Sequence, residues 1–278
     1  MDFGNGFMVQ EQTVFGLVSC AQSAQGRTVN QIMRHMRSFT LIQEGLQTGL
    51  DFLYSGQCHA CGEAVMGQGR LCGACYAQLH LLRGARCGLC AQPMAGLSPD
   101  GQIISCDDCL HAPPPWDRGF AACQYRGTAR SLILALKHAD RTDLAHPLGM
   151  MMARALGDVP QGAVIAPVPL HWMRALSRRY NQAGLLADVI AAQTGLPVMH
   201  TLLRRLRRTR MMEHFSRAQR IAAQQGSIQC TRLAPKHVIV VDDVMTTGAT
   251  CTAATTALRM MGAQDVTILT LARVAKPL

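Results

Sequence analysis

The fold of this chain is decided by the stretch His237-Val238-Ile239-Val240-Val241-Asp242-Asp243-Val244-Met245-Thr246-Thr247-Gly248-Ala249-Thr250. Its β-branched run predicts a buried parallel strand. Two adjacent carboxylates follow where that strand is expected to end, and a loop of threonine, glycine and alanine comes next. Apolar residues at helical spacing after the loop predict a helix (Ala254, Ala257, Leu258 and Met261). A strand, a small-residue loop and a helix N-terminus in this order are typical of a phosphate-binding site, because loop N–H groups and the helix end attract anions.

The two carboxylates indicate what lies beside the phosphate. Asp242 and Asp243 would repel a phosphate group, but they can accept hydrogen bonds from two vicinal hydroxyls. The implied ligand is therefore a sugar 5-phosphate. The alternative is an ordinary strand–turn–helix with a solvated aspartate pair, which would not require threonines and glycine at these positions.

The same stretch resembles the phosphoribosyl pyrophosphate (PRPP) signature of type I phosphoribosyltransferases. The resemblance implies that Asp242 and Asp243 are the catalytic pair and bind the ribose 2- and 3-hydroxyls. It also implies that the loop binds the 5-phosphate through five residues: Thr246, Thr247, Gly248, Ala249 and Thr250.

Composition narrows the class of protein. The chain has 278 residues, of which 49% are hydrophobic and 16% charged, so it can bury a sizeable core in one large or two modest domains. Its net charge of +10 favours acidic partners, either a polyphosphate substrate or nucleic acid. Aromatic residues make up 5%, which argues against a surface built on stacked bases. No apolar run approaches the roughly 18 residues that span a bilayer, so we expect no membrane partner.

The N-terminal region, residues 1–36, shows no usable periodicity and is expected to be disordered or a mis-started extension. Leu17-Val18-Ser19-Cys20 superficially matches a lipoprotein cleavage site. However, the residues before it include no Lys or Arg and carry Glu11, whereas a secretory signal begins with basic residues. We therefore predict a cytoplasmic location and a reducing environment.

Eight of the twelve cysteines form four C-x-x-C pairs. Two such pairs complete a tetrahedral zinc site of four thiolates, which has no open position for water and is therefore structural. Redox chemistry is disfavoured because no thioredoxin-like strand–helix context surrounds any pair. The pairs provide for two Zn²⁺ ions. Sequential pairing would place one ion on Cys58, Cys61, Cys72 and Cys75 and the other on Cys87, Cys90, Cys106 and Cys109, and interleaved pairing is the alternative.

The order of patterns along the chain predicts two domains. A double zinc-ribbon domain is expected at 37–112, and it begins with a short amphipathic helix over residues 38–54. The proline-rich stretch 112–117 is a stiff connector. Strands alternating with helices over 117–278 then predict an α/β domain with a mostly parallel sheet covered by helices on both faces.

Within the second domain we expect strands at 120–125, 163–170, 196–203 and 266–271 in addition to the one that begins at His237. Helices are expected at 128–138, at about 142–156, and from about 180 until Gly195 ends the helix. Ligands of parallel sheets lie beyond the carboxyl ends of the strands. Asp242, Asp243 and the segment after Pro169 should therefore converge.

Further motifs, in a fixed order, resemble the ComF/GntX family of competence-associated phosphoribosyltransferase-like proteins. After the zinc knuckles and the prolines come Pro167-Val168-Pro169-Leu170-His171, then Arg178-Arg179-Tyr180-Asn181-Gln182-Ala183, then Ser216-Arg217-Ala218-Gln219-Arg220, then the signature. The resemblance implies a type I phosphoribosyltransferase-like fold that binds PRPP with Mg²⁺. It places the following residues around the pocket: Lys137, Arg174, Arg179, Asn181, Arg217 and Arg220.

Three functions follow from the resemblance. The first is an enzyme, a glycosyltransferase that transfers the pentosyl group of PRPP to a nitrogen acceptor. The second is a competence or DNA-uptake factor that binds single-stranded DNA and other competence proteins without turnover, favoured by the basic run 204–210. The third is a PRPP-sensing regulator. Met212 and Phe215 stand where family members commonly carry other residues in a mobile catalytic segment, which bears on turnover rather than on phosphate binding.

Overall fold

A computed structural model of the chain describes residues 56–65, 71–95, 104–170, 180–207 and 217–275. The predicted N-terminal extension and the predicted helix at 38–54 lie outside these residues. Gln57–Leu278 forms one compact unit, and the description below concerns that unit. In the part of the chain that is described, no helix is long and apolar enough to cross a membrane.

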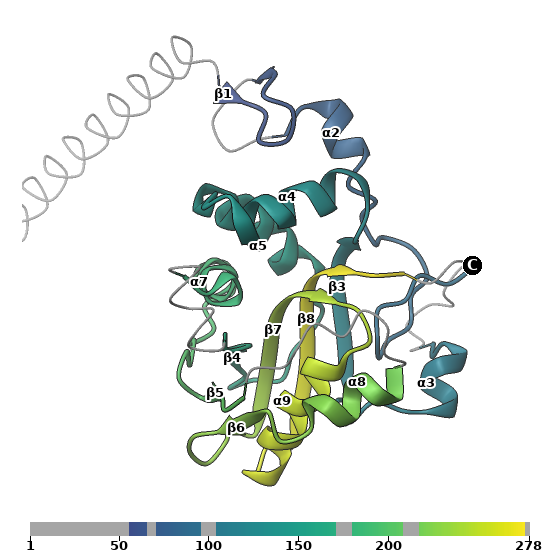
Figure 1. The fold of residues 1–278 in the computed structure, drawn as a ribbon, viewed down its shortest axis with the longest axis vertical. Coiled ribbons are helices and arrows are strands. Elements are labelled where there is room, and N and C mark those ends of the chain that lie inside the picture. The colour runs from purple at the N-terminus through teal and green to yellow at the C-terminus, as the bar shows by residue number, and fades with distance from the viewer. Residues whose placement is uncertain (1–55, 66–70, 96–103, 171–179, 208–216, 276–278) are drawn as a thin grey trace, which may run out of the picture. The chain divides into compact units, whose positions relative to one another are not determined.

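A four-stranded parallel sheet forms the centre of the molecule (Figure 1). Its strands, in spatial order, are β3 (Arg118–Gln124), β8 (Asp265–Arg273), β7 (His237–Met245) and β4 (Val164–Pro167). Every neighbouring pair is parallel. The predicted parallel α/β sheet is confirmed.

Helices connect the strands and cover both faces of the sheet. After β3 the chain forms α4 (Gly127–His138), a 3₁₀ turn η1 (Thr142–Leu144) and α5 (Ala145–Ala155). After β4 it forms α7 (Gln182–Thr194), and later α8 (Arg217–Gln224) and α9 (Ala249–Met260). Gly195 ends α7 in the left-handed conformation predicted for it, with φ of 72°.

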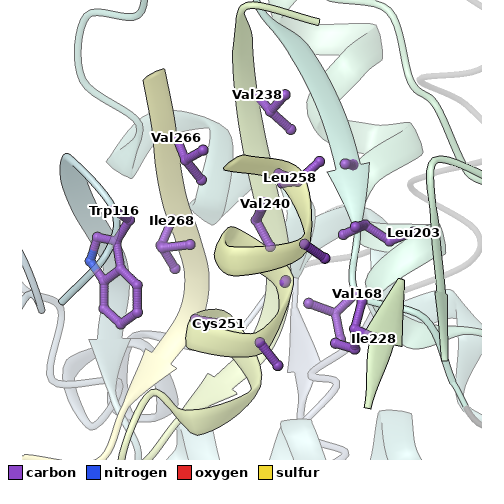
Figure 2. Packing of buried hydrophobic residues seen from close by; sticks show 14 of the residues in the cluster. Trp116, Val168, Leu203, Ile228, Val238, Val240, Cys251, Leu258, Val266 and Ile268 are labelled. Atoms are coloured by element: carbon purple, nitrogen blue, oxygen red, sulfur yellow. The ribbon is translucent and has the colours of Figure 1, made fainter. Parts of the chain in front are cut away.

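The alternation of side chains along β7 explains why the sheet is covered twice. Ile239 and Val241 lie in a buried cluster with residues of α4, α5 and α7. Val238 and Val240 point the other way and pack with α9, as Figure 2 shows. A strand buried on both faces needs a continuous apolar run, and β7 has one.

Two predictions about strands were wrong, one for the end of a strand and one for a whole strand. The strand expected to end before the aspartates continues through them to Met245, because β8 pairs with β7 along this whole length. The strand expected at 196–203 is not formed. Val198 makes only a bridge to Ile165, and a turn that closes with the bond from Leu202 N–H to the Met199 carbonyl then redirects the chain.

After that turn a short antiparallel pair forms instead, between β5 (Leu203–Arg205) and β6 (Ile228–Cys230). The cysteine-rich region contains β1 (Gly56–Gln57), β2 (Ala64–Val65), α2 (Gly73–Ala77) and α3 (Asp107–His111).

Candidate functional site

The loop after β7 is built around Gly248, which precedes α9. Its φ of 78° lies in the left-handed region that favours glycine. A Cβ at this position would also lie 2.9 Å from Cη2 of Trp116, so the side chain is excluded on two grounds. Thr246 is exposed while Thr247 and Thr250 are half-buried, which leaves the first hydroxyl accessible beside the start of α9. A glycine turn with an accessible threonine before a helix is an arrangement that can bind an anion.

The two aspartates lie in the second half of β7, beside the end of α4. Lys137 Nζ lies 2.9 Å from Asp243 Oδ1, and the two side chains are 19% and 16% exposed. The Asp243 backbone N–H donates to Asp242 Oδ1 at 2.9 Å. The structure thus brings together Lys137, Asp242 and Asp243, three of the residues that the sequence assigns to the site.

The pKa of Asp242 is raised to about 7. Burial is the largest cause, and the like charge of Asp243 adds to it, while Lys137 and Arg205 act in the opposite direction. Near neutral pH Asp242 is therefore a mixture of its protonated and ionised forms. Such an arrangement is ready to accept hydrogen bonds from hydroxyls and responds strongly to an added cation.

The structure describes some of the other predicted site residues and leaves two of them outside its described range. Asn181 lies before α7, and its Nδ2 donates to the Val168 carbonyl at 3.1 Å, which joins α7 to the end of β4. Arg220 lines a cavity of about 340 Å³ together with Thr246 and Thr247. Arg217 begins α8, and Arg174 and Arg179 lie outside the described residues.

Two residues that the sequence did not single out also line this cavity, Trp116 and Arg273. Arg273 is the last residue of β8 and is only 8% exposed. Its guanidinium donates to the backbone carbonyls of Cys90, Met245, Thr246 and Val274. These acceptors are backbone atoms, which every residue carries, so the sequence holds no signal that identifies Arg273.

The cysteines form two separate groups of four, each with its sulfur atoms within 4.8 Å of one another. The groups are Cys58, Cys61, Cys72 and Cys75, and Cys87, Cys90, Cys106 and Cys109. The sequential pairing is the one found.

The sulfur spacing in both groups fits zinc. The distance between the sulfurs of Cys61 and Cys72 is 3.7 Å, and between those of Cys90 and Cys106 it is 3.6 Å. A tetrahedral ion with Zn–S bonds of about 2.3 Å requires sulfurs about 3.8 Å apart. Burial, followed by the neighbouring Cys87 charge, raises the pKa of Cys109 to about 12, so the four thiols need a dication to ionise together.

Comparisons with known proteins give a match to the cysteine-rich region and matches to larger parts of the chain. A family model described as a double zinc ribbon domain matches residues 49–110. The chain is 29% identical over 219 residues to DNA utilization protein YhgH of Salmonella typhi, which covers 73% of this chain and 96% of that protein. It is 24% identical over 220 residues to Competence protein F of Haemophilus influenzae, with the same shares covered.

Among solved structures, the chain is similar to glutamine PRPP amidotransferase from B. subtilis complexed with ADP and GMP, with a TM-score of 0.31 and 25% sequence identity. The match covers 45% of this chain and spans a quarter (25%) of the length of that chain. The expected resemblance to competence-associated proteins is confirmed by the curated relatives. The chain carries a double zinc ribbon and is a homologue of Competence protein F and of the YhgH proteins.

Proposed function

We propose that residues 242–250 bind PRPP together with Mg²⁺. The observation that carries the proposal is the juxtaposition of the half-buried aspartate pair, ion-paired to Lys137, with the glycine loop that opens α9. The loop N–H groups and threonine hydroxyls would take the 5-phosphate. Asp242 and Asp243 would accept bonds from the ribose hydroxyls.

The carboxylate oxygens of Asp242 and Asp243 also suit Mg²⁺, which prefers oxygen ligands and often completes its shell with substrate phosphates. The ion neutralises part of the charge of the departing pyrophosphate when it is bound. Arg220 lies beside Thr246 and Thr247 on the cavity wall, so it would add positive charge at the phosphate end of the ligand. Arg174, Arg179 and Arg217 are proposed for the same role from the motifs.

The proposed reaction is pentosyl transfer to a nitrogen acceptor. The bond between the anomeric carbon and the pyrophosphate oxygen breaks, and a bond between the same carbon and the acceptor nitrogen forms. Positive charge develops on the ribose ring between these two events, and the adjacent carboxylates stabilise it. We propose that this reaction serves the use of DNA, a role supported by the names of the relatives, and that it takes place in the cytoplasm.

Titration calorimetry with PRPP and excess Mg²⁺ tests the site. We expect binding by the wild type and loss of binding in Asp243→Asn. Asp265→Asn is the matched control, because Asp265 begins β8 at the opposite end of the sheet, where it pairs with Arg118. Equal binding by both variants would contradict the assignment. Incubation of isotope-labelled PRPP with nucleobases, nucleosides or single-stranded DNA then identifies the acceptor by pyrophosphate release.

A second candidate function, binding of single-stranded DNA, is favoured by the basic net charge and by the names of the relatives. The net charge is +10, and Arg204 and Arg207 are exposed at the edge of the β5–β6 pair. Binding to DNA phosphates falls steeply with salt, with a slope set by the number of contacts. Fluorescence anisotropy of a labelled oligonucleotide at several salt concentrations distinguishes this function from PRPP binding, which requires Mg²⁺. We propose that the chain comprises a double zinc-ribbon domain at 37–112 and a phosphoribosyltransferase-like domain at 117–278.

A further inference from the structure

The turn Cys87–Cys90 contains two ligands of the second zinc site and is called the second zinc knuckle below. It is bonded to the α/β sheet and to the residues before it through three consecutive backbone carbonyls. Gly88 O accepts from Gly119 N–H at 2.8 Å. Leu89 O accepts from the Trp116 indole N–H at 2.6 Å, and Cys90 O accepts from Arg273 Nε at 2.9 Å. The conformation of these three carbonyls depends on the turn between two zinc ligands, Cys87 and Cys90.

Strand β3 approaches the zinc knuckle closely at Gly119. A Cβ on Gly119 would lie 2.0 Å from Leu89 O, so only glycine allows β3 to reach the knuckle. Trp116 is 4% exposed and shares one buried cluster with Cys87, Cys90 and Cys109. The knuckle therefore packs against the sheet, in addition to being joined to it by the chain.

Two of the three donors also hold the candidate phosphate loop. Arg273 Nη1 donates to Met245 O at 3.1 Å and to Thr246 O, while its Nε is bonded to the knuckle. The Trp116 ring lies against Gly248, whose missing Cβ leaves room for it. One arginine and one tryptophan thus connect the zinc knuckle directly to the loop.

The first zinc site makes different contacts. His59, between two of its ligands, lies 3.2 Å from Asp143 and is bonded to Arg141, and both of these residues lie at the turn before α5. That turn follows α4, whereas the contacts of Trp116 and Arg273 lead from the loop at 245–249 to the second zinc site. The two zinc sites can therefore be compared within one molecule.

We propose that the second zinc ribbon is part of the phosphate site. The zinc-bound turn at Cys87–Cys90 fixes Trp116 and Arg273, and these positioning residues fix the loop from Met245 to Ala249. PRPP binding then depends on zinc at the second site and is independent of zinc at the first, which deepens the proposed function and rests on it. Because coupling between two sites is reciprocal, PRPP also raises the affinity of the second site for zinc.

The coupling is tested first without any ligand, by amide hydrogen exchange of the full zinc-loaded chain. Cys106→Ser removes one ligand of the second site, and Cys61→Ser, the matched control, removes one ligand of the first. Elemental analysis should show that each variant has lost one zinc ion. We expect exchange in the peptide spanning 245–251 to rise about tenfold in Cys106→Ser, since charge-assisted hydrogen bonds are lost, and to stay at the wild-type rate in Cys61→Ser.

A second pair of variants keeps both zinc ions and covers the case in which Cys106→Ser does not fold. Arg273→Lys retains the charge, but a single ammonium cannot bridge Cys90 O and Met245 O as the planar guanidinium does. Arg118→Lys is its control, because Arg118 forms a two-bond pair with Asp265 at the other end of the sheet. We expect faster exchange at 245–251 in Arg273→Lys and no change at this loop in Arg118→Lys.

PRPP with Mg²⁺ is then titrated into all four variants, with the Trp116 emission as a spectroscopic readout in a Trp172→Phe background. We expect affinity about tenfold weaker in Cys106→Ser and Arg273→Lys and unchanged in the two controls. The coupling would be overturned if amide hydrogen exchange at 245–251 were unchanged after loss of the second zinc. It would also be overturned if exchange and PRPP affinity changed equally in Cys61→Ser. Absence of PRPP binding by the wild type would refute the proposed function alone, because the exchange experiment still judges the coupling.

Discussion

Ionisation of Asp242 should destabilise the fold, and replacing Asp242 by Asn tests this. Asn has nearly the shape of a protonated aspartate but cannot ionise. The pKa of Asp242 is raised from 3.8 to about 7, chiefly by burial and then by the charge of Asp243. Ionisation of Asp242 is therefore harder in the folded protein than in the unfolded chain.

The stability of the folded protein should fall as the pH rises through the pKa of Asp242. A carboxyl whose pKa is raised by folding contributes stability that is fully present below the unfolded value, near pH 4, and is lost as the pH rises through about 7. The pKa shift corresponds to at most about 4 kcal/mol, since one unit is worth about 1.36 kcal/mol. We expect about half of this, about 2 kcal/mol, because the side chain is only partly buried and water screens the charge.

Urea unfolding of wild type and Asp242→Asn between pH 5 and pH 8 measures the effect. The variant should be more stable, by a margin that grows up to about pH 7 and then levels off. Asp143→Asn is a control of opposite sign, because bonding to Arg141 lowers the pKa of Asp143 and so stabilises the folded state above the unfolded pKa. A constant margin for Asp242→Asn, or a loss of stability at pH 8, would refute the reasoning.

Three further predictions concern the loop, the metals and the sheet. Gly248→Ala should lower stability by about 1–2 kcal/mol more than Gly162→Ala in thermal unfolding, because both have positive φ but only the first meets Trp116; equal losses would contradict this. A strong chelator should unfold residues 57–111, monitored by circular dichroism and zinc release, and an unchanged melting profile would argue against structural zinc. Arg118→Met should weaken the fold by about 1–3 kcal/mol in urea, because Asp265 loses a two-bond partner, while its zinc content stays at the wild-type value.

Much of the fold could be predicted because its signals are local. The apolar run before Asp242 identifies a strand buried on both faces, and β7 packs on both sides as expected. The four C-x-x-C pairs identify two metal centres, since each turn brings its two thiols together without help from the rest of the chain.

The predictions that were wrong concern segments whose structure depends on tertiary contacts. The strand does not end before Asp242, because β8 offers a partner through Met245, and no local signal records the length of a neighbouring strand. The predicted strand at 196–203 is reduced to a bridge, since a turn leads the chain away from β4. Both results show tertiary pairing overriding local propensity.

The residues that join the zinc knuckle to the loop were missed for the same reason. Arg273 and Cys90 are 183 positions apart in the sequence, and Trp116 and Leu89 are 27 apart. Arg273 looks like an ordinary strand end until its bonds to backbone carbonyls are seen. Such bonds leave no pattern in a single sequence, because the acceptors are backbone atoms that every residue carries.

The central claim is that Asp242 and Asp243 form a PRPP site with the loop that follows them. Thermal unfolding with and without PRPP and Mg²⁺ tests it most directly, in the wild type and in the double variant Asp242→Ala/Asp243→Ala. A ligand at about 100 times its Kd stabilises the folded state by about 2.7 kcal/mol, which should raise the wild-type Tm by about 5 °C. We predict this rise in the wild type and none in the double variant; equal shifts in both proteins would contradict the account.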